Sequence, residues 1–260
     1  MTYSISDFSM DFFMLRGKVA LVTGGGGGLG QGFAVALAKA GADLFVVTHG
    51  SHWDETKALI EAEGRRATFF QANLGRKEEI PGVIAACMQA YGRIDILVNN
   101  AGMIKRAPLL ESSDQDWRAV LDLNLDAVYY LSREAAKVMA AQGAGKIINI
   151  ASMTSFQGGK FIPAYTASKH GVAGLTKAFA NELAERNIQV NAIAPGYMET
   201  NNTAAIRSDE ERNEEILKRI PAGRWGRPGD LMGAVVFLAS RASDYLNGHI
   251  LAVDGGWLAR

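Results

Sequence analysis

Five consecutive glycines, at positions 24–28, separate the apolar run KVALVT from a pattern typical of a helix. Glycine destabilises a regular element by roughly 0.5–1 kcal/mol relative to alanine, so such a run indicates a place where side chains are unfavourable. In a turn between a strand and a helix, backbone N–H groups and the positive end of the helix dipole face an anion. Glycine clusters also form ordinary loops, but the position after the first expected strand predicts a pyrophosphate site.

The rest of the chain alternates short apolar runs with longer helical patterns. DLFVVT, ATFFQA, IDILVNN and KIINIAS are four such runs. This alternation predicts an α/β fold: a Rossmann-type, doubly wound and mainly parallel sheet of about seven strands, with helices on both faces. The runs are continuously apolar, as expected of strands buried on both faces. The length of 260 residues favours one domain, at 13–260, after an N-terminal extension at 1–12.

Composition narrows the class of partner. The 27 basic and 27 acidic residues give a formal charge of zero, which argues against nucleic acid or an anionic membrane as partner and favours a small molecule. No apolar stretch is long enough for a membrane span, and the N-terminus lacks the features of a secretory signal, so a cytoplasmic location is expected. Cys87 is the single cysteine and is expected in the core, which excludes a disulfide framework. The histidines show no metal-ligand spacing, so no metal site is expected.

Two expected helices carry more apolar surface than one sheet face needs. Residues 115–141 are apolar around much of the helix, and residues 165–186 combine an apolar stripe with small residues elsewhere. Self-association would bury the second face, although a deeply buried helix explains the pattern as well. The aromatic residues of the extension are expected to be loosely held or to cover a neighbouring subunit.

Several motifs occur together, in order. Gly24, Gly28 and Gly30 follow T-G-x-x-x-G-x-G; residues 99–102 read N-N-A-G; Tyr165 and Lys169 form Y-x-x-x-K, thirteen residues after Ser152. With Asn124 and the segment Pro195–Thr200, they make the chain, from Gly17 onward, resemble the short-chain dehydrogenase/reductase family. The cofactor-binding residues implied by the resemblance are Gly24, Gly28, Leu29, Gly30, Thr48, Asn73, Leu74, Asn100, Ala101, Gly102, Tyr165, Lys169, Pro195, Gly196 and Thr200.

The Y-x-x-x-K spacing places a phenol and an ammonium on one helix face. A phenol has an ordinary pKa of about 10, and a neighbouring cation is expected to lower it. The resemblance implies four catalytic residues: Ser152 polarises the substrate oxygen, Tyr165 exchanges its proton, Lys169 adjusts Tyr165 and binds the nicotinamide ribose, and Asn124 holds a water that links Lys169 to solvent.

The residues after the second expected strand bear on the choice of cofactor. The acidic residue that often binds the ribose 2′-hydroxyl is absent from Val47–Gly50, and no cation stands there or at Gly25 to bind a 2′-phosphate. These features favour NAD(H) without excluding NADP(H). Asn73 stands where the family usually has aspartate, and its amide oxygen can still accept a hydrogen bond from adenine.

The segments INIASMTSFQGG, APGYMETNNT and IPAGRWGRPGDLMG resemble sugar-acid dehydrogenases within the family, which act in uronate breakdown. The resemblance implies a 3-deoxy sugar acid as substrate, hydride transfer at a secondary alcohol or ketone, and a homotetramer. The alternatives are a reductase for another carbonyl, such as a 3-oxoacyl thioester or polyol, and a non-catalytic dinucleotide-sensing protein. Residues 196–225 are expected to form a mobile cover or a fixed surface element. Four cations are candidates to border the site, with no choice among them: Lys105, Arg106, Lys160 and Arg224.

Overall fold

The computed structural model describes residues 5–260, with Asn202 described by its backbone alone. Seven strands form one parallel sheet in the order β3-β2-β1-β4-β5-β6-β7, which confirms the predicted fold class. Strands β1 to β6, apart from partly exposed β3, are almost wholly buried, as their continuous apolar runs predicted. The strands are β1 Val19–Thr23, β2 Asp43–Thr48, β3 Ala67–Gln71, β4 Ile96–Asn99, β5 Gly145–Ile150, β6 Ile188–Pro195 and β7 Ile250–Val253.

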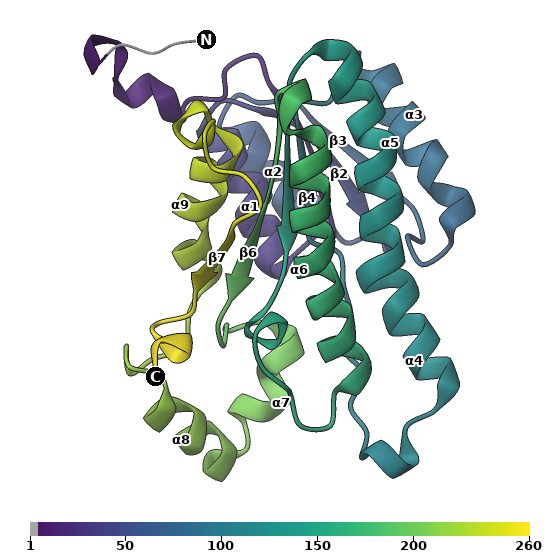
Figure 1. Cartoon of the computed structure of the whole chain (residues 1–260), viewed down its shortest axis with the longest axis vertical. Coiled ribbons are helices and arrows are strands. Elements are labelled where there is room, and N and C mark those ends of the chain that lie inside the picture. The colour runs from purple at the N-terminus through teal and green to yellow at the C-terminus, as the bar shows by residue number, and fades with distance from the viewer. Residues whose placement is uncertain (1–4) are drawn as a thin grey trace.

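Helices cover both faces of the sheet (Figure 1). On one face, α1 (Gly28–Lys39), α2 (Asp54–Ala62) and α9 (Pro228–Ala239) pack over the strands. On the other face lie α3 (Ile80–Tyr91), α5 (Ala127–Gln142) and α6 (Pro163–Leu183), and Cys87 of α3 is buried there in the core as predicted. Burial raises the pKa of the Cys87 thiol to about 12, so it is an unreactive packing group near neutral pH.

The long helix expected at 115–141 is interrupted. α4 (Asp114–Leu121) continues into α5 through a π-helical segment, Asp122–Asp126. Such segments often occur at functional sites because the inserted residue redirects a side chain. Here the buried residue of the segment is Asn124.

The carboxyl ends of the strands all open toward one end of the molecule, where α7 (Ala204–Arg207) and α8 (Glu210–Arg219) lie (Figure 1). The chain crosses from β3 at the sheet edge to β4 beside β1, so neighbouring connections diverge between β1 and β4. Ligands of open α/β sheets bind at such a point.

The first described residues, from Ile5 onward, lie near the opposite end (Figure 1). Of the predicted extension at 1–12, residues 1–4 lie outside the described residues. The others form the 3₁₀ turns Ile5–Asp7 and Met10–Phe13, whose residues are largely exposed.

Candidate active site

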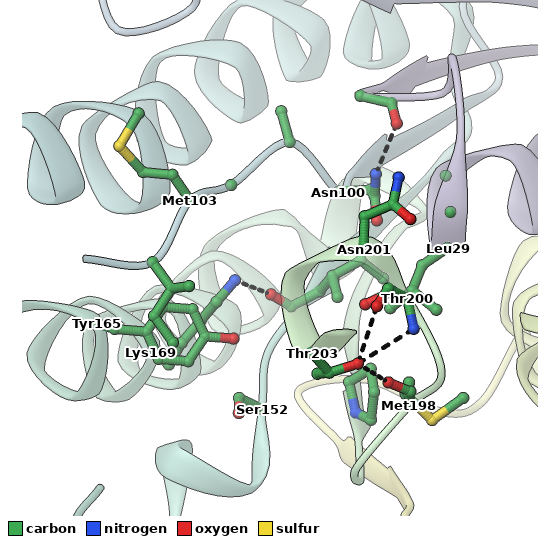
Figure 2. A pocket seen from close by; sticks show the side chains of 18 of the residues that line it. Leu29, Asn100, Met103, Ser152, Tyr165, Lys169, Met198, Thr200, Asn201 and Thr203 are labelled. Carbon is green, nitrogen blue, oxygen red and sulfur yellow. Dashed lines mark hydrogen bonds between the residues drawn. The ribbon is translucent and has the colours of Figure 1, made fainter. Parts of the chain in front are cut away.

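A pocket of about 530 Å³ opens at the carboxyl edge of the sheet. Figure 2 shows two sides: Leu29 and Asn100 lie on one, which we call the glycine side, and Ser152, Tyr165 and Lys169 lie on the other, the tyrosine side. The predicted residues that line the pocket are Gly24, Gly28, Leu29, Gly30, Asn100, Ala101, Gly102, Ser152, Tyr165, Lys169, Pro195, Gly196 and Thr200.

The glycine side consists of backbone that is free of side chains, for two different reasons. Gly24 and Gly28 have positive φ angles of 66° and 56°, and a Cβ atom on Gly30 would overlap the Gly24 carbonyl oxygen. Around Gly27 and Gly28, by contrast, an added Cβ would meet no protein atom within 4 Å. These two glycines leave open space in front of the N-terminus of α1, so the turn fits a dinucleotide pyrophosphate.

Asn100 fixes this turn to β4. Its side-chain amide donates to the carbonyl oxygens of Thr23 and Gly24, at 2.9 and 3.2 Å. The Thr23 hydroxyl in turn accepts hydrogen bonds from the backbone N–H groups of Asn100 and Ala101, both at 3.0 Å. The glycine turn and the N-N-A-G motif therefore form one hydrogen-bonded unit.

The tyrosine side is built on α6 and the end of β5. Ser152 caps the 3₁₀ turn Met153–Ser155, its hydroxyl accepting from the N–H of Thr154 at 3.2 Å. The Lys169 ammonium donates to the carbonyl of Ile150 at 2.6 Å and lies 5.6 Å from the centre of the Tyr165 ring. The phenol, the hydroxyl and the ammonium thus face one pocket.

Burial sets the charge states on this side. It raises the pKa of the Tyr165 phenol, while Ser152 and the charge of Arg106 act in the opposite direction. Burial lowers the pKa of the Lys169 ammonium to about 8. We expected the ammonium to bring the pKa of the phenol below its ordinary value. In the structure the loss of solvation outweighs the lowering by Ser152 and Arg106, so the pKa of Tyr165 lies above its ordinary value and the phenol is protonated at neutral pH.

Asn124 lies behind the pocket and is fully buried. Its amide oxygen accepts from the N–H of Met103 at 2.8 Å, and its amide nitrogen donates to the carbonyl of Met103 at 2.9 Å and to the Ser168 hydroxyl at 3.3 Å. The π-helical segment therefore aims Asn124 at the chain that leaves β4. This contact positions the segment after N-N-A-G.

Three predicted cofactor residues are not among those that line the pocket. Thr48 donates to the carbonyl of Gly50 at 2.8 Å, and the Asn73 side chain accepts from the N–H of Gly75 at 3.1 Å. Leu74 is buried in the core. Thr48 is the last residue of β2, and Asn73 and Leu74 lie just after β3, at the same edge of the sheet. Their contact with a cofactor stays a prediction.

Residues 196–225 cover the site from the side of β6. Trp225 and Trp257 are buried with Met153 and Ile216, so they anchor α8 to the body by packing. At the pocket, the Thr203 hydroxyl donates to the carbonyls of Met198 and Thr200, at 2.6 and 3.0 Å (Figure 2). The structure thus shows a packed element, while its mobility stays a prediction.

Arg106 is the cation that the sequence alone did not single out. It lines the pocket and acts on the Tyr165 phenol. The other three candidates do not line this pocket. Lys105 pairs with Asp116 at 3.4 Å, Arg224 pairs with Asp230 at 2.8 Å, and Lys160 lies over the ring of Phe161. Other lining residues missed from the sequence come directly after the N-N-A-G and P-G motifs, and that adjacency was the available signal: Met103, Ile104, Met198, Glu199, Asn201 and Thr203.

In the described chain, residues 5–260, no group of histidine, cysteine, aspartate or glutamate side chains could hold a metal, and no helix is long and apolar enough to cross a membrane. A bare-backbone phosphate turn facing a serine, tyrosine and lysine defines a dinucleotide-dependent oxidoreductase.

Comparison with known proteins narrows this class. A family model described as enoyl-(acyl carrier protein) reductase matches residues 25–258. The 2-dehydro-3-deoxy-D-gluconate 5-dehydrogenase of Bacillus subtilis is 58% identical over 250 residues, which cover 96% of this chain and 98% of that protein. The chain belongs to the short-chain dehydrogenase/reductase family.

Solved structures agree with this assignment. A protein of Agrobacterium tumefaciens, provisionally assigned as a 2-deoxy-D-gluconate 3-dehydrogenase and crystallised with NADP, is 51% identical with a TM-score of 0.89, over 95% of this chain and 99% of that one. The gluconate 5-dehydrogenase of Burkholderia cenocepacia, in complex with NADP and tartrate, is 39% identical with a TM-score of 0.91, over 96% and 98%.

Proposed function

We propose that this protein oxidises or reduces a 3-deoxy sugar acid, as a 2-dehydro-3-deoxy-D-gluconate 5-dehydrogenase that serves uronate catabolism. The observation that carries this proposal is the position of Arg106 in the same pocket as the Tyr165 phenol. A guanidinium pairs well with a carboxylate, and the reacting oxygen of the substrate needs a proton donor. The 58% identity to a relative of that activity supports the same substrate class.

In the proposed reaction, a bound nicotinamide accepts or supplies the hydride. When a ketone is reduced, the Tyr165 phenol donates its proton to the new alkoxide, and the Ser152 hydroxyl holds that oxygen. When an alcohol is oxidised, Tyr165 must first lose its proton, and burial, which raises the pKa of the phenol, opposes that step. Lys169 binds the ribose of the cofactor and assists proton loss, and Asn124 connects it to solvent through a water.

For the cofactor, NAD(P) dependence is established by the family, and we propose a preference for NAD. The support is the absence of lysine and arginine from His49–His52, after β2, where a 2′-phosphate would need a cation. The two solved relatives described above contain NADP, so the preference needs a direct test. We expect a lower KM for NAD than for NADP at equal substrate; a clear advantage for NADP would contradict the preference.

The substrate proposal is tested by following NAD(P)H absorbance with the purified protein. We expect turnover of 2-dehydro-3-deoxy-D-gluconate, and of its 2,5-diketo product in the reverse direction. A matched panel contains an acetoacetyl thioester and a polyol. Turnover of a panel compound alone would discard the sugar acid but keep the enzyme class, and binding of the dinucleotide without any turnover would favour a sensor.

We also propose a cytoplasmic homotetramer. The support is a groove of about 460 Å³ between α5 and α6, where Tyr129 is 38% exposed and packs against Phe179. A second copy of this chain would cover these aromatic rings. Sedimentation equilibrium tests the assembly, and a monomer at micromolar concentration would contradict it.

A further inference from the structure

Phe161 has an unusual backbone conformation for a large side chain. In the described part of the chain, Phe161 and Asn187 are the non-glycine residues with positive φ, at 67° and 57°. Asparagine tolerates this region, whereas a bulky aromatic residue there is strained. The Phe161 ring is 48% exposed, so its burial does not compensate for the strain. Strained residues of this kind are concentrated at functional sites.

The conformation of Phe161 joins the two segments that form the mouth of the pocket. Its carbonyl oxygen accepts a hydrogen bond from the N–H of Ala107 at 3.0 Å. Ala107 follows Arg106 in the segment after β4, and Phe161 lies four residues before Tyr165, in the loop that leads into α6. The bond therefore connects the residue next to Arg106 with the loop that precedes the helix of the phenol.

This bond is the second of two attachments of the same segment. Residues 103–107 are held at their first residue by Asn124, which bonds both backbone groups of Met103. The Phe161 carbonyl holds their last residue, Ala107. Arg106 lies between these attachments, so its position over the pocket depends on both.

The loop around Phe161 has little room to relax. The N–H of Gly159 donates to the Thr166 hydroxyl at 3.2 Å, which folds the loop onto the first turns of α6. A Cβ atom on Gly159 would lie 2.6 Å from Cγ1 of Ile162. A change of the Phe161 backbone would therefore redirect its carbonyl rather than be absorbed by its neighbours.

We propose that Phe161 is a positioning residue for substrate recognition: its left-handed backbone directs its carbonyl at Ala107 and so holds Arg106 beside the Tyr165 phenol. The inference rests on the proposed function, in which Arg106 receives the substrate carboxylate. It assigns the role to the backbone conformation and not to the ring.

The test compares Phe161→Gly, which keeps positive φ accessible, with Phe161→Val, whose β-branched side chain disfavours it. For Phe161→Val we expect the KM for the sugar acid to rise about tenfold, with the KM for the uncharged amide of that acid nearly unchanged, because misplacing Arg106 weakens a charge-assisted contact. Phe161→Gly should keep both values within about twofold of wild type. Asn187→Val is the matched control, because its positive φ lies far along the chain in a cap before β6; it should lower Tm without changing KM.

An equal rise in KM for Phe161→Gly would assign the effect to the ring, and an unchanged KM for Phe161→Val would remove the role altogether; either result overturns the proposal. If Phe161→Val does not fold, hydrogen exchange on the wild-type protein and Phe161→Gly decides: a protected Ala107 amide in both supports the proposal, and an unprotected one overturns it. Arg106→Leu distinguishes a failure of the proposed function from a failure of the role proposed for Phe161. If it leaves the KM unchanged, the carboxylate contact in the proposed function fails too; if it raises the KM while Phe161→Val does not, only the role of Phe161 fails.

Discussion

The glycine side of the pocket consists mainly of glycine backbone, which the Thr23 and Asn100 side chains hold in place, whereas the tyrosine side is assembled from side chains of three separate segments. On the glycine side, Asn100 and Thr23 bond the turn directly, and close contacts exclude any Cβ at Gly30. On the tyrosine side, Arg106, Ser152 and Tyr165 come from connections after different strands or from α6. The glycine backbone fits the pyrophosphate, which every dinucleotide shares. The side chains on the tyrosine side can select the substrate, because each comes from a different segment.

The largest effect that would sharpen this comparison is expected from Gly30→Ala. The new Cβ would overlap the Gly24 carbonyl and lie 2.6 Å from the Asn100 side-chain nitrogen, so the turn must move. We expect a loss of about 2–4 kcal/mol in the free energy of unfolding and loss of measurable dinucleotide binding. Urea unfolding measures the loss in the free energy of unfolding. Gly82→Ala is the control, because its Cβ meets no atom within 4 Å and alanine favours its helix.

The next largest effect is expected at Lys169. Burial of its ammonium lowers the free energy of unfolding, because the charge loses its hydration. Its pKa is about 8 in the folded protein and 10.5 ordinarily. Below pH 8 both states carry the proton and the full cost applies; between pH 8 and 10.5 the unfolded state binds more protons, so stability rises with pH. Lys169→Met should therefore abolish turnover and yet stabilise the protein at pH 7 by at most about 3 kcal/mol.

The measurement for Lys169→Met is the free energy of unfolding as a function of pH. The difference from wild type should shrink as the pH rises from 8 to 10.5. The exposed Lys137→Met is the control and should show no such dependence. A pH-independent difference for Lys169→Met would mean that the pKa of the Lys169 ammonium is not lowered in the folded protein.

A smaller effect is expected on the tyrosine side from Arg106→Leu. Loss of one charge-assisted contact should raise the KM for the sugar acid about 10- to 30-fold while the affinity for the dinucleotide stays unchanged. Steady-state kinetics with the acid and its amide measure the effect. Lys105→Leu is the matched neighbour, since Lys105 pairs with Asp116, and it should leave KM near wild type. Equal losses in the two variants would show a general effect of charge.

The smallest effect is expected from Gly27→Ala, which separates the fold of the turn from its use. Gly27 has extended backbone and open space around an added Cβ, so the variant should unfold at nearly the wild-type temperature. The methyl group would project into the space assigned to the pyrophosphate, and dinucleotide affinity should fall about tenfold. An unchanged affinity would show that the open space does not receive the phosphates.

The sequence predicted the parts of the molecule that depend on local geometry. The strand, glycine turn and helix at residues 19–39 could be recognised because a bare backbone is needed there whatever the tertiary context. Tyr165 and Lys169 could be placed on one helix face because their spacing fixes it. Both predictions agree with the structure.

The rest depends on contacts between distant segments. The π-helical segment at Asn124 was not predicted, because helical periodicity does not reveal an inserted residue whose side chain bonds Met103. Arg106 could not be selected among four cations, because only the folded chain shows which of them lines the pocket. The raised pKa of Tyr165 likewise depends on burial by the whole fold.

The central claim is that one pocket holds a dinucleotide on bare backbone opposite a phenol that exchanges the proton. Tyr165→Phe tests it most directly, with dinucleotide affinity and kcat measured on the same preparation. The account predicts an affinity within about twofold of wild type and a kcat lower by at least about 10²- to 10³-fold, since the ring remains and only the proton donor is lost. A kcat near the wild-type value would contradict it.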